Sequence, residues 1–167
     1  MILELRSLDL VVKLMGRVGV CLSGNYVLCD RSGGVLDVEL TSDGPELLDQ
    51  PLDGCCVHAN HFLCAAHATA DNHAQSLPDS FRRQERMTEL VAQRLGRLTV
   101  DDFKEILGDH EGHPSSICRH AHDGPHHPML NPHGQTVAAI IAEPAQGRLH
   151  VSRGNPCENP FVEYSMP

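Results

Sequence analysis

An asparagine flanked by two histidines is the first group in this sequence whose residue types suit chemistry. Asn60 lies between His58 and His61. A carboxamide is a fixed, neutral hydrogen-bond donor, and such donors stabilise an anion that forms only in a transition state. The ordinary alternative is an asparagine that closes a strand by bonding its own backbone. His58 and His61 can act in acid–base chemistry, but we favour them as supports that hold the amide.

A second group centres on an arginine. Asp79 and Ser80 lie one helical turn before Arg83. A guanidinium in this position can hold a carboxylate in fork geometry or lower the pKa of a nearby thiol. The alternative is a solvated helix face whose charged side chains pair with one another: Arg82, Arg83, Glu85, Arg86 and Glu89.

The chain contains twelve histidines in 167 residues, and they concentrate in the Gly- and Pro-rich stretch 110–133. That stretch offers several zinc-ligand types: Cys118, His122, Asp123, His126, His127 and His133. It has no Cys-x-x-Cys, no His-Glu-x-x-His and no ligand pair at helical spacing on a predictable helix. We therefore expect no specific metal site and interpret His120 as structural. A histidine-loop metal-binding protein remains an alternative.

The seven cysteines are an odd number, and the first residues lack the basic and apolar segments of a secretory signal. We therefore expect reduced thiols in a cytoplasmic protein. Cys55, Cys56 and Cys64 lie near Asn60, but buried cysteines usually act as small apolar side chains. Cys157 fits a turn. We expect none of the cysteines to be catalytic.

Composition excludes several classes of protein. The apolar fraction of 41% is typical of a globular domain. The net charge of −9 argues against nucleic-acid binding. No apolar run approaches the roughly 18 residues of a membrane span. We expect neither a nucleic-acid nor a membrane partner.

Local patterns predict the elements that position these residues. Ser7 can cap a helix whose apolar stripe runs to Val18, and further helices are expected at 79–95 and 99–107. Two hairpins are expected. One joins 26–29 to 35–40, and the other joins 136–142 to 148–152.

Between these elements the sequence predicts loops and one further strand. The alternation of apolar and acidic residues in 35–40 predicts one solvated face. We expect polar loops at 41–54 and 108–134, and a short strand at 55–63. Hairpins with helices between them predict an α+β fold, and we expect one domain over 1–167 without an internal boundary.

Four motifs occur in a fixed order along the chain. They are His58-Ala59-Asn60-His61-Phe62, Asp79-Ser80-Phe81-Arg82-Arg83-Gln84-Glu85-Arg86, Asp109-His110 with Ile117-Cys118-Arg119-His120, and Gly154-Asn155-Pro156-Cys157. In this order they resemble the downstream half of the acyl-CoA:6-aminopenicillanic-acid acyltransferase family, a group of N-terminal-nucleophile (Ntn) hydrolases. The resemblance implies the second half of a four-layer αββα sandwich.

The resemblance also implies roles for the site residues. Asn60 would help to stabilise the tetrahedral oxyanion, and Arg83 would lie near the nucleophile. Four further residues would support them: His58, His61, Asp79 and Ser80. Family members cut themselves before a cysteine whose thiol attacks and whose freed α-amine is the base. Because that cysteine lies upstream of the matched motifs, we expect it to be absent from this chain.

The implied reaction is acyl transfer from an amide or thioester to water or an amine, with no cofactor. Acyl-CoA is a possible substrate. The implied partners are a small-molecule acyl donor and acceptor, and either a complementary N-terminal half or a second copy of the chain. The non-enzymatic alternative is an inactive, truncated relative that serves as a binding or oligomerisation module.

Overall fold

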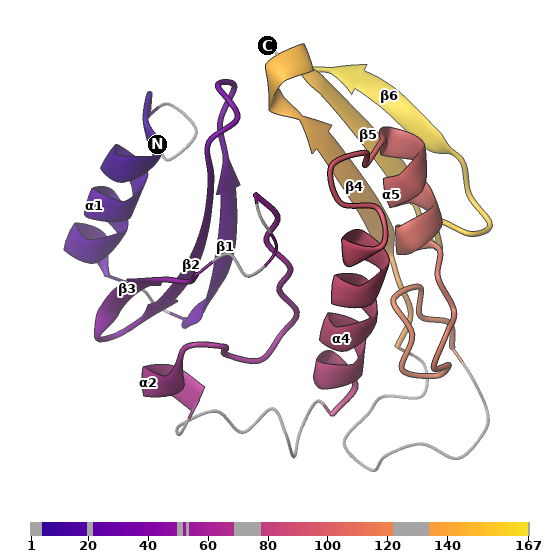
Figure 1. The fold of residues 1–167 in the computed structure, drawn as a ribbon, viewed down its shortest axis with the longest axis horizontal. Coiled ribbons are helices and arrows are strands. Elements are labelled where there is room, and N and C mark those ends of the chain that lie inside the picture. Colours follow the sequence, from indigo (N-terminus) through magenta and orange to yellow (C-terminus); the bar gives the residue numbers. More distant parts are fainter. Residues whose placement is uncertain are drawn as a thin grey trace. The chain divides into compact units, whose positions relative to one another are not determined.

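The computed structural model describes residues 5–19, 22–49, 52, 54–68, 78–121 and 134–166. The chain forms two compact units, Met1–Asp71 and Asn72–Pro167. In the described part there are four α-helices and two three-stranded antiparallel sheets (Figure 1). This confirms the predicted α+β class. The prediction of a single domain concerns how the two units come together, and it stays a prediction.

Unit 1 consists of one long helix, one sheet and a short helix. Its elements are α1 (Leu8–Val18), β1 (Gly24–Cys29), β2 (Val35–Thr41), β3 (Gly44–Leu47) and α2 (Ala65–Ala68). The Ser7 side chain caps α1 by accepting a hydrogen bond from the Leu10 amide, as expected. The sheet order is β1-β2-β3, so the predicted hairpin is confirmed. The loop predicted at 41–54 is wrong in part, because it contains β3.

The core of unit 1 lies between α1 and the sheet. Val11 and Met15 of α1 form a buried cluster with Val38 and Leu40 of β2. Because side chains alternate across a strand, Asp37 and Glu39 lie on the other face of β2. They are also buried, with exposed fractions of 4% and 0%. The prediction of a solvated acidic face is therefore wrong.

The segment 54–64 makes polar contacts with the acidic face of β2, and it is not the strand predicted there. Its only described pairing is an isolated bridge between Cys55 and Leu52. The side chain of Glu39 accepts hydrogen bonds from the backbone amides of Leu63 and Cys64. These two backbone amides therefore bond to a side-chain carboxylate and not to the backbone of a neighbouring strand.

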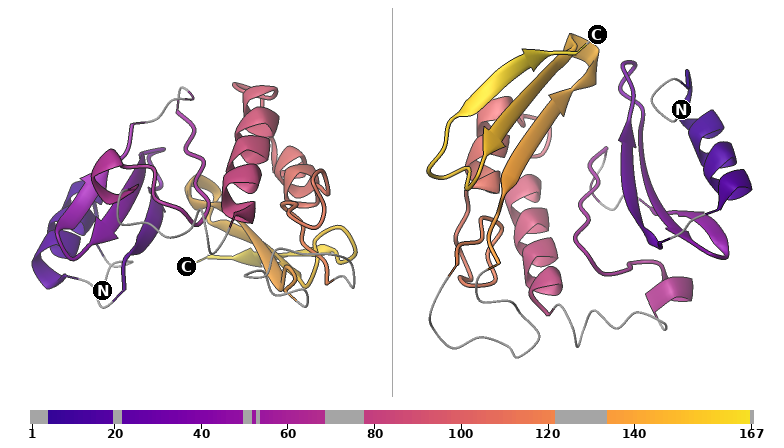
Figure 2. Two further views of the ribbon diagram at one scale, coloured as in Figure 1. Left: turned by 90° about the horizontal axis from the view of Figure 1, so that it is seen from below. Right: turned by 180° about the vertical axis from the view of Figure 1, so that it is seen from behind.

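Unit 2 places two helices on one face of an antiparallel sheet (Figures 1 and 2). The elements are α4 (Asp79–Ala92), α5 (Val100–Leu107), β4 (Ala138–Glu143), the 3-10 turn η2 (Pro144–Gln146), β5 (Arg148–Arg153) and β6 (Phe161–Ser165). The sheet order is β4-β5-β6. Both helices and the β4–β5 hairpin confirm the predictions, and β6 adds an edge strand.

The two faces of the β4–β6 sheet differ in exposure. Ala139, Ile141 and Ser152 are buried. On the opposite face Ile140, Val151 and Val162 lie side by side in register. Ile140 is 61% exposed and Val162 is 51% exposed. The sheet therefore has one packed face and one apolar face that is largely open.

None of the helices that the structure describes has the length and apolar character that crossing a bilayer requires.

Candidate functional site

In unit 1, a buried carboxylate fixes the segment that carries Asn60. Glu39 is fully buried in the central strand β2. Its Oε1 lies 2.8 Å from Nε2 of His58, and its Oε2 accepts a 3.1 Å hydrogen bond from the Cys64 amide. A single side chain therefore holds the chain on both sides of Asn60.

His58 connects this carboxylate to the loop backbone. Its Nδ1 lies 2.9 Å from the carbonyl oxygen of Ala59, and its side chain is only 3% exposed. Because one ring nitrogen faces the Glu39 carboxylate and the other faces the Ala59 carbonyl, the ring bridges the buried strand and the loop. It thereby anchors the residue that immediately precedes Asn60.

Asn60 lies at the surface, whereas its two histidine neighbours are inside. Asn60 is exposed, and His61 is 5% exposed. The strand that Asn60 would close under the alternative interpretation is absent from residues 56–63. The arrangement presents a carboxamide from a segment anchored below it, which is the form that a preorganised donor needs.

In unit 2, the predicted residues group at the start of α4. Asp79 and Ser80 are buried, with exposed fractions of 2% and 0%. Oδ2 of Asp79 accepts a 3.2 Å hydrogen bond from Nε of Arg83 and a 3.4 Å contact from Nη1 of Arg119. The Asp79 carboxylate thus orients two guanidinium groups. Arg119 is a member of this group that sequence reasoning missed.

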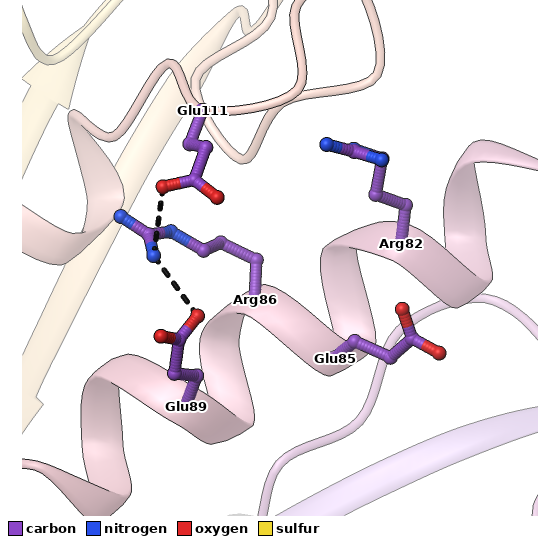
Figure 3. A pocket seen from close by; sticks show the side chains of 5 residues that line it. All are labelled: Arg82, Glu85, Arg86, Glu89 and Glu111. Carbon is purple, nitrogen blue, oxygen red and sulfur yellow. Dashed lines mark hydrogen bonds and ion pairs between the residues drawn. The ribbon is translucent and has the colours of Figure 1, made fainter.

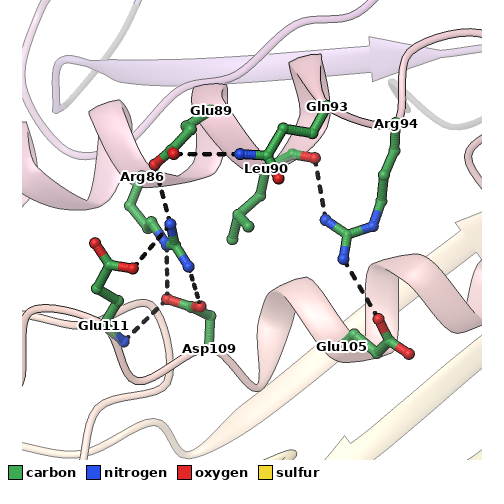
Figure 4. A network of polar contacts seen from close by, with 8 residues as sticks. All are labelled: Arg86, Glu89, Leu90, Gln93, Arg94, Glu105, Asp109 and Glu111. Atoms are coloured by element: carbon green, nitrogen blue, oxygen red, sulfur yellow. Dashed lines mark hydrogen bonds and ion pairs between the residues drawn. The ribbon is translucent and has the colours of Figure 1, made fainter.

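The interpretation of α4 as a self-paired, charged face fits Arg86 better than Arg83. Arg86 binds both oxygens of Asp109, at 3.1 and 2.8 Å (Figure 4). It also pairs with Glu89 and Glu111, at 3.0 and 2.9 Å. The Arg86 guanidinium holds the pKa of the Asp109 carboxyl below its usual range. Arg86 therefore fixes the loop after α5 to α4.

An open hollow lies beside this network on the outside of α4. Figure 3 shows its five lining side chains, which are Arg82, Glu85, Arg86, Glu89 and Glu111. All five are charged, and Arg86 already pairs with two of the glutamates. Ligand pockets are mostly apolar with a few polar groups, so this hollow does not suit an acyl chain.

Cys56, one of the cysteines close to Asn60 in sequence, is a poor nucleophile. Burial raises the pKa of Cys56 to about 11, and the nearby charge of Asp37 adds to this effect. Burial also raises the pKa of Cys29. A raised pKa reduces the thiolate fraction at neutral pH, and thiolate is the attacking form.

Sequence reasoning also missed a group of potential metal ligands in unit 2. The side chains of His110, Cys118, His120 and Cys157 meet at one place. The only close pair in sequence is Cys118-x-His120, and Cys157 is brought in from a distant turn. Residues 122–133, which include the ligands expected from the histidine-rich loop, lie outside the described residues.

The predicted site residues thus form two groups. His58, Asn60 and His61 lie together in unit 1, and Asp79, Ser80 and Arg83 lie together in unit 2. The prediction that both groups face one cleft stays a prediction.

The model of the family described as acyl-coenzyme A:6-aminopenicillanic acid acyl-transferase matches residues 1–158. The match covers unit 1, unit 2 up to residue 158 and all four sequence motifs.

Proposed function

We propose, because this chain belongs to the acyl-coenzyme A:6-aminopenicillanic acid acyl-transferase family, that it supplies the oxyanion donor and a guanidinium to an Ntn-type acyl transfer or amide hydrolysis. Asn60 donates its amide to the tetrahedral oxyanion, and Arg83 lies beside the nucleophile. The substrate is an amide or a thioester such as an acyl-CoA. We place the protein in the cytoplasm.

The observation that carries this proposal is the support beneath Asn60. An oxyanion donor gains its effect from being held in place before the reaction starts. The Glu39 carboxylate, which is fully buried, fixes His58 and two backbone amides around the loop. Asn60 itself remains exposed. This anchoring holds the segment that carries the exposed Asn60 amide in a fixed position, as an oxyanion donor requires.

Arg83 is the second contributor. Its Nε is bound by Asp79, whose side chain is 1% exposed, while the Arg83 side chain is 24% exposed. Arg83 is thus oriented by a buried partner and still reaches the surface. A guanidinium in this setting favours a thiolate or binds a carboxylate.

The nucleophile in this proposal is a cysteine outside the 167 residues, paired with its own α-amine. The high pKa of Cys56 supports this assignment over Cys56 itself as the nucleophile. A complementary segment would then supply the thiol and complete an αββα sandwich. Each unit here is one helical layer on one antiparallel sheet, and the exposed face around Ile140 and Val162 suits a covering layer.

The test is steady-state kinetics on the product of the complete gene, with acyl-CoA thioesters and 6-aminopenicillanic acid as acceptor. We expect Asn60→Ala to lower kcat by roughly 10²–10³-fold with little change in KM, since the amide acts mainly in the transition state. Gln93→Ala, which removes an exposed carboxamide from the residue directly after α4, is the matched control. Unchanged kcat in a folded Asn60→Ala variant would refute the role of Asn60.

The alternative is an inactive relative that serves as an oligomerisation module. The apolar face of the β4–β6 sheet favours it, because exposed apolar patches commonly mark interaction sites. The same assay separates the two functions. An oligomerisation module would show no turnover above background in the wild type.

A further inference from the structure

Four side chains of types that bind metal ions come together in unit 2. Nε2 of His110 and Nε2 of His120 are 3.0 Å apart. The sulfur atoms of Cys118 and Cys157 are 3.5 Å apart. Nε2 of His120 lies 3.7 Å from Cys118 Sγ and 3.2 Å from Cys157 Sγ. All four atoms lie within 4.8 Å of one another.

These separations match the edges of a zinc tetrahedron. Zinc binds cysteine sulfur at about 2.3 Å and histidine nitrogen at about 2.0–2.1 Å. Tetrahedral angles then place two sulfurs about 3.8 Å apart, two nitrogens about 3.3 Å apart, and a sulfur and a nitrogen about 3.6 Å apart. Four of the six distances between the ligand atoms fall within about half an ångström of these values.

The surroundings of the four side chains also resemble those of a metal site. Ligating histidines usually have a carboxylate or carbonyl near the other ring nitrogen. Here Nδ1 of His120 lies 3.8 Å from Oε1 of Glu158. Nδ2 of Asn155 lies 3.5 Å from Cys118 Sγ, as a donor to a thiolate would.

The backbone around the ligands is fixed by the same residues. Nδ2 of Asn155 also donates to the carbonyl oxygen of Arg119, at 2.7 Å. The Cys118 amide donates to the carbonyl oxygen of Asp109, at 2.9 Å. Arg86 grips the side chain of Asp109 (Figure 4). These hydrogen bonds fix the loop after α5 and the turn before β6, which carry the four side chains.

We propose that unit 2 carries a structural zinc site formed by His110, Cys118, His120 and Cys157. Four protein ligands leave no open position for a substrate, so the ion acts on structure and not on chemistry. On binding, the two thiols lose their protons to solvent and both sulfurs bind as thiolates. The ion ties the loop after α5 to the turn before β6. This site is independent of the proposed acyl transfer.

The test is metal analysis of the full chain, purified without a histidine tag under reducing conditions. We expect about one zinc ion per chain. Replacement by cobalt should give visible bands of tetrahedral geometry and thiolate-to-cobalt charge-transfer bands. The cobalt measurement needs no variant, so it stands even where a ligand substitution prevents folding.

Variants then assign the ligands. Cys118→Ser and His110→Ala should lose the bound zinc. The matched control is His113→Ala, an exposed histidine of the same loop that is outside the cluster. A double variant, His126→Ala with His127→Ala, should keep its zinc.

Three results would overturn the proposal. One is a wild-type protein that takes up no zinc after reconstitution. Another is zinc that survives Cys118→Ser but is lost in the His126 and His127 double variant, since that places the metal in the histidine-rich loop. The last is a disulfide between Cys118 and Cys157 that persists under reducing conditions and leaves no thiolate for cobalt.

Discussion

Glu39 anchors the segment that carries Asn60, although nothing in its type suggests catalysis. It lies on the central strand of unit 1 with no exposed surface. A buried carboxylate is costly unless every oxygen is bonded or paired. Here both oxygens are used, by His58 and by the Leu63 and Cys64 amides. The position of Asn60 therefore depends on a residue distant from it in sequence.

We predict that Glu39→Gln destabilises unit 1 by about 1–3 kcal/mol, the usual cost of a buried hydrogen-bonding group left without its partner. The new NH₂ group would face either the His58 ring and the Leu63 amide or the Cys64 amide, where a carboxylate oxygen had accepted. Urea unfolding measures the change in the free energy of unfolding. The matched control is Glu46→Gln, because Glu46 lies opposite Glu39 on the neighbouring strand β3 but is exposed. Equal unfolding midpoints for the two variants would contradict the anchoring role.

At the scale of elements, α5 shows how local chemistry positions a functional loop. Thr99 and Asp102 form a capping box at its start, with mutual hydrogen bonds of 2.9 and 3.2 Å between backbone and side chains. The helix ends at Leu107, directly before the loop that carries Asp109 and His110. Because the capping box fixes the residue at which α5 begins, it also helps to fix the position of the loop that follows the helix.

We predict that Thr99→Ala lowers the stability of unit 2 by about 1 kcal/mol at neutral pH. The difference from wild type should shrink in acid. The Thr99 hydroxyl, then the Thr99 amide, hold the pKa of Asp102 below its usual range. A lowered folded-state pKa gives stability that is present above the unfolded value, about 3.9, and is lost as the pH falls through the folded value.

Thermal melts of the two proteins between pH 7 and pH 2 measure this effect. The control is Asp101→Asn, which removes an exposed neighbouring carboxylate that pairs with Lys104 and takes no part in the capping box. If the difference in Tm between Thr99→Ala and the wild type stays constant down to pH 2, the capping box does not depend on the charge of Asp102.

At the scale of the whole molecule, each unit has its own apolar packing. Leu40 is 3% exposed in the core of unit 1, and Ile106 is 1% exposed in unit 2. The residues expected to form the acyl-transfer site divide between the units, whereas all four proposed zinc ligands belong to unit 2. The proposed acyl transfer would therefore require both units, whereas the proposed zinc binding would not.

We predict that the units unfold as one domain. Leu40→Ala and Ile106→Ala should each cost about 2–5 kcal/mol, and each should lower amide protection in both units by the same factor. Hydrogen exchange with mass spectrometry reports the two units separately. Ala139→Gly and Val27→Ala serve as mild controls in the two sheets. If protection falls only in the unit that carries the substitution, the chain consists of two independently folding domains.

Short-range patterns were sufficient for most of the helices and hairpins. Ser7 and Thr99 cap helices through atoms a few residues away, and the turn at 30–34 is closed by Asp30, whose side chain accepts from the amides of Ser32 and Gly34. Such interactions are local, so sequence spacing predicts them. The family resemblance was also readable from four short motifs.

Only the tertiary structure decided what the acidic residues of β2 and the scattered histidines and cysteines do. Period-2 alternation predicted that Glu39 faces solvent, but an irregular segment that follows in the chain supplies it with three donors. Cys118 and Cys157 are separated by 39 positions in sequence, and no spacing rule joins them. Contacts of this kind form because packing closes the chain on itself, and packing depends on every element at once.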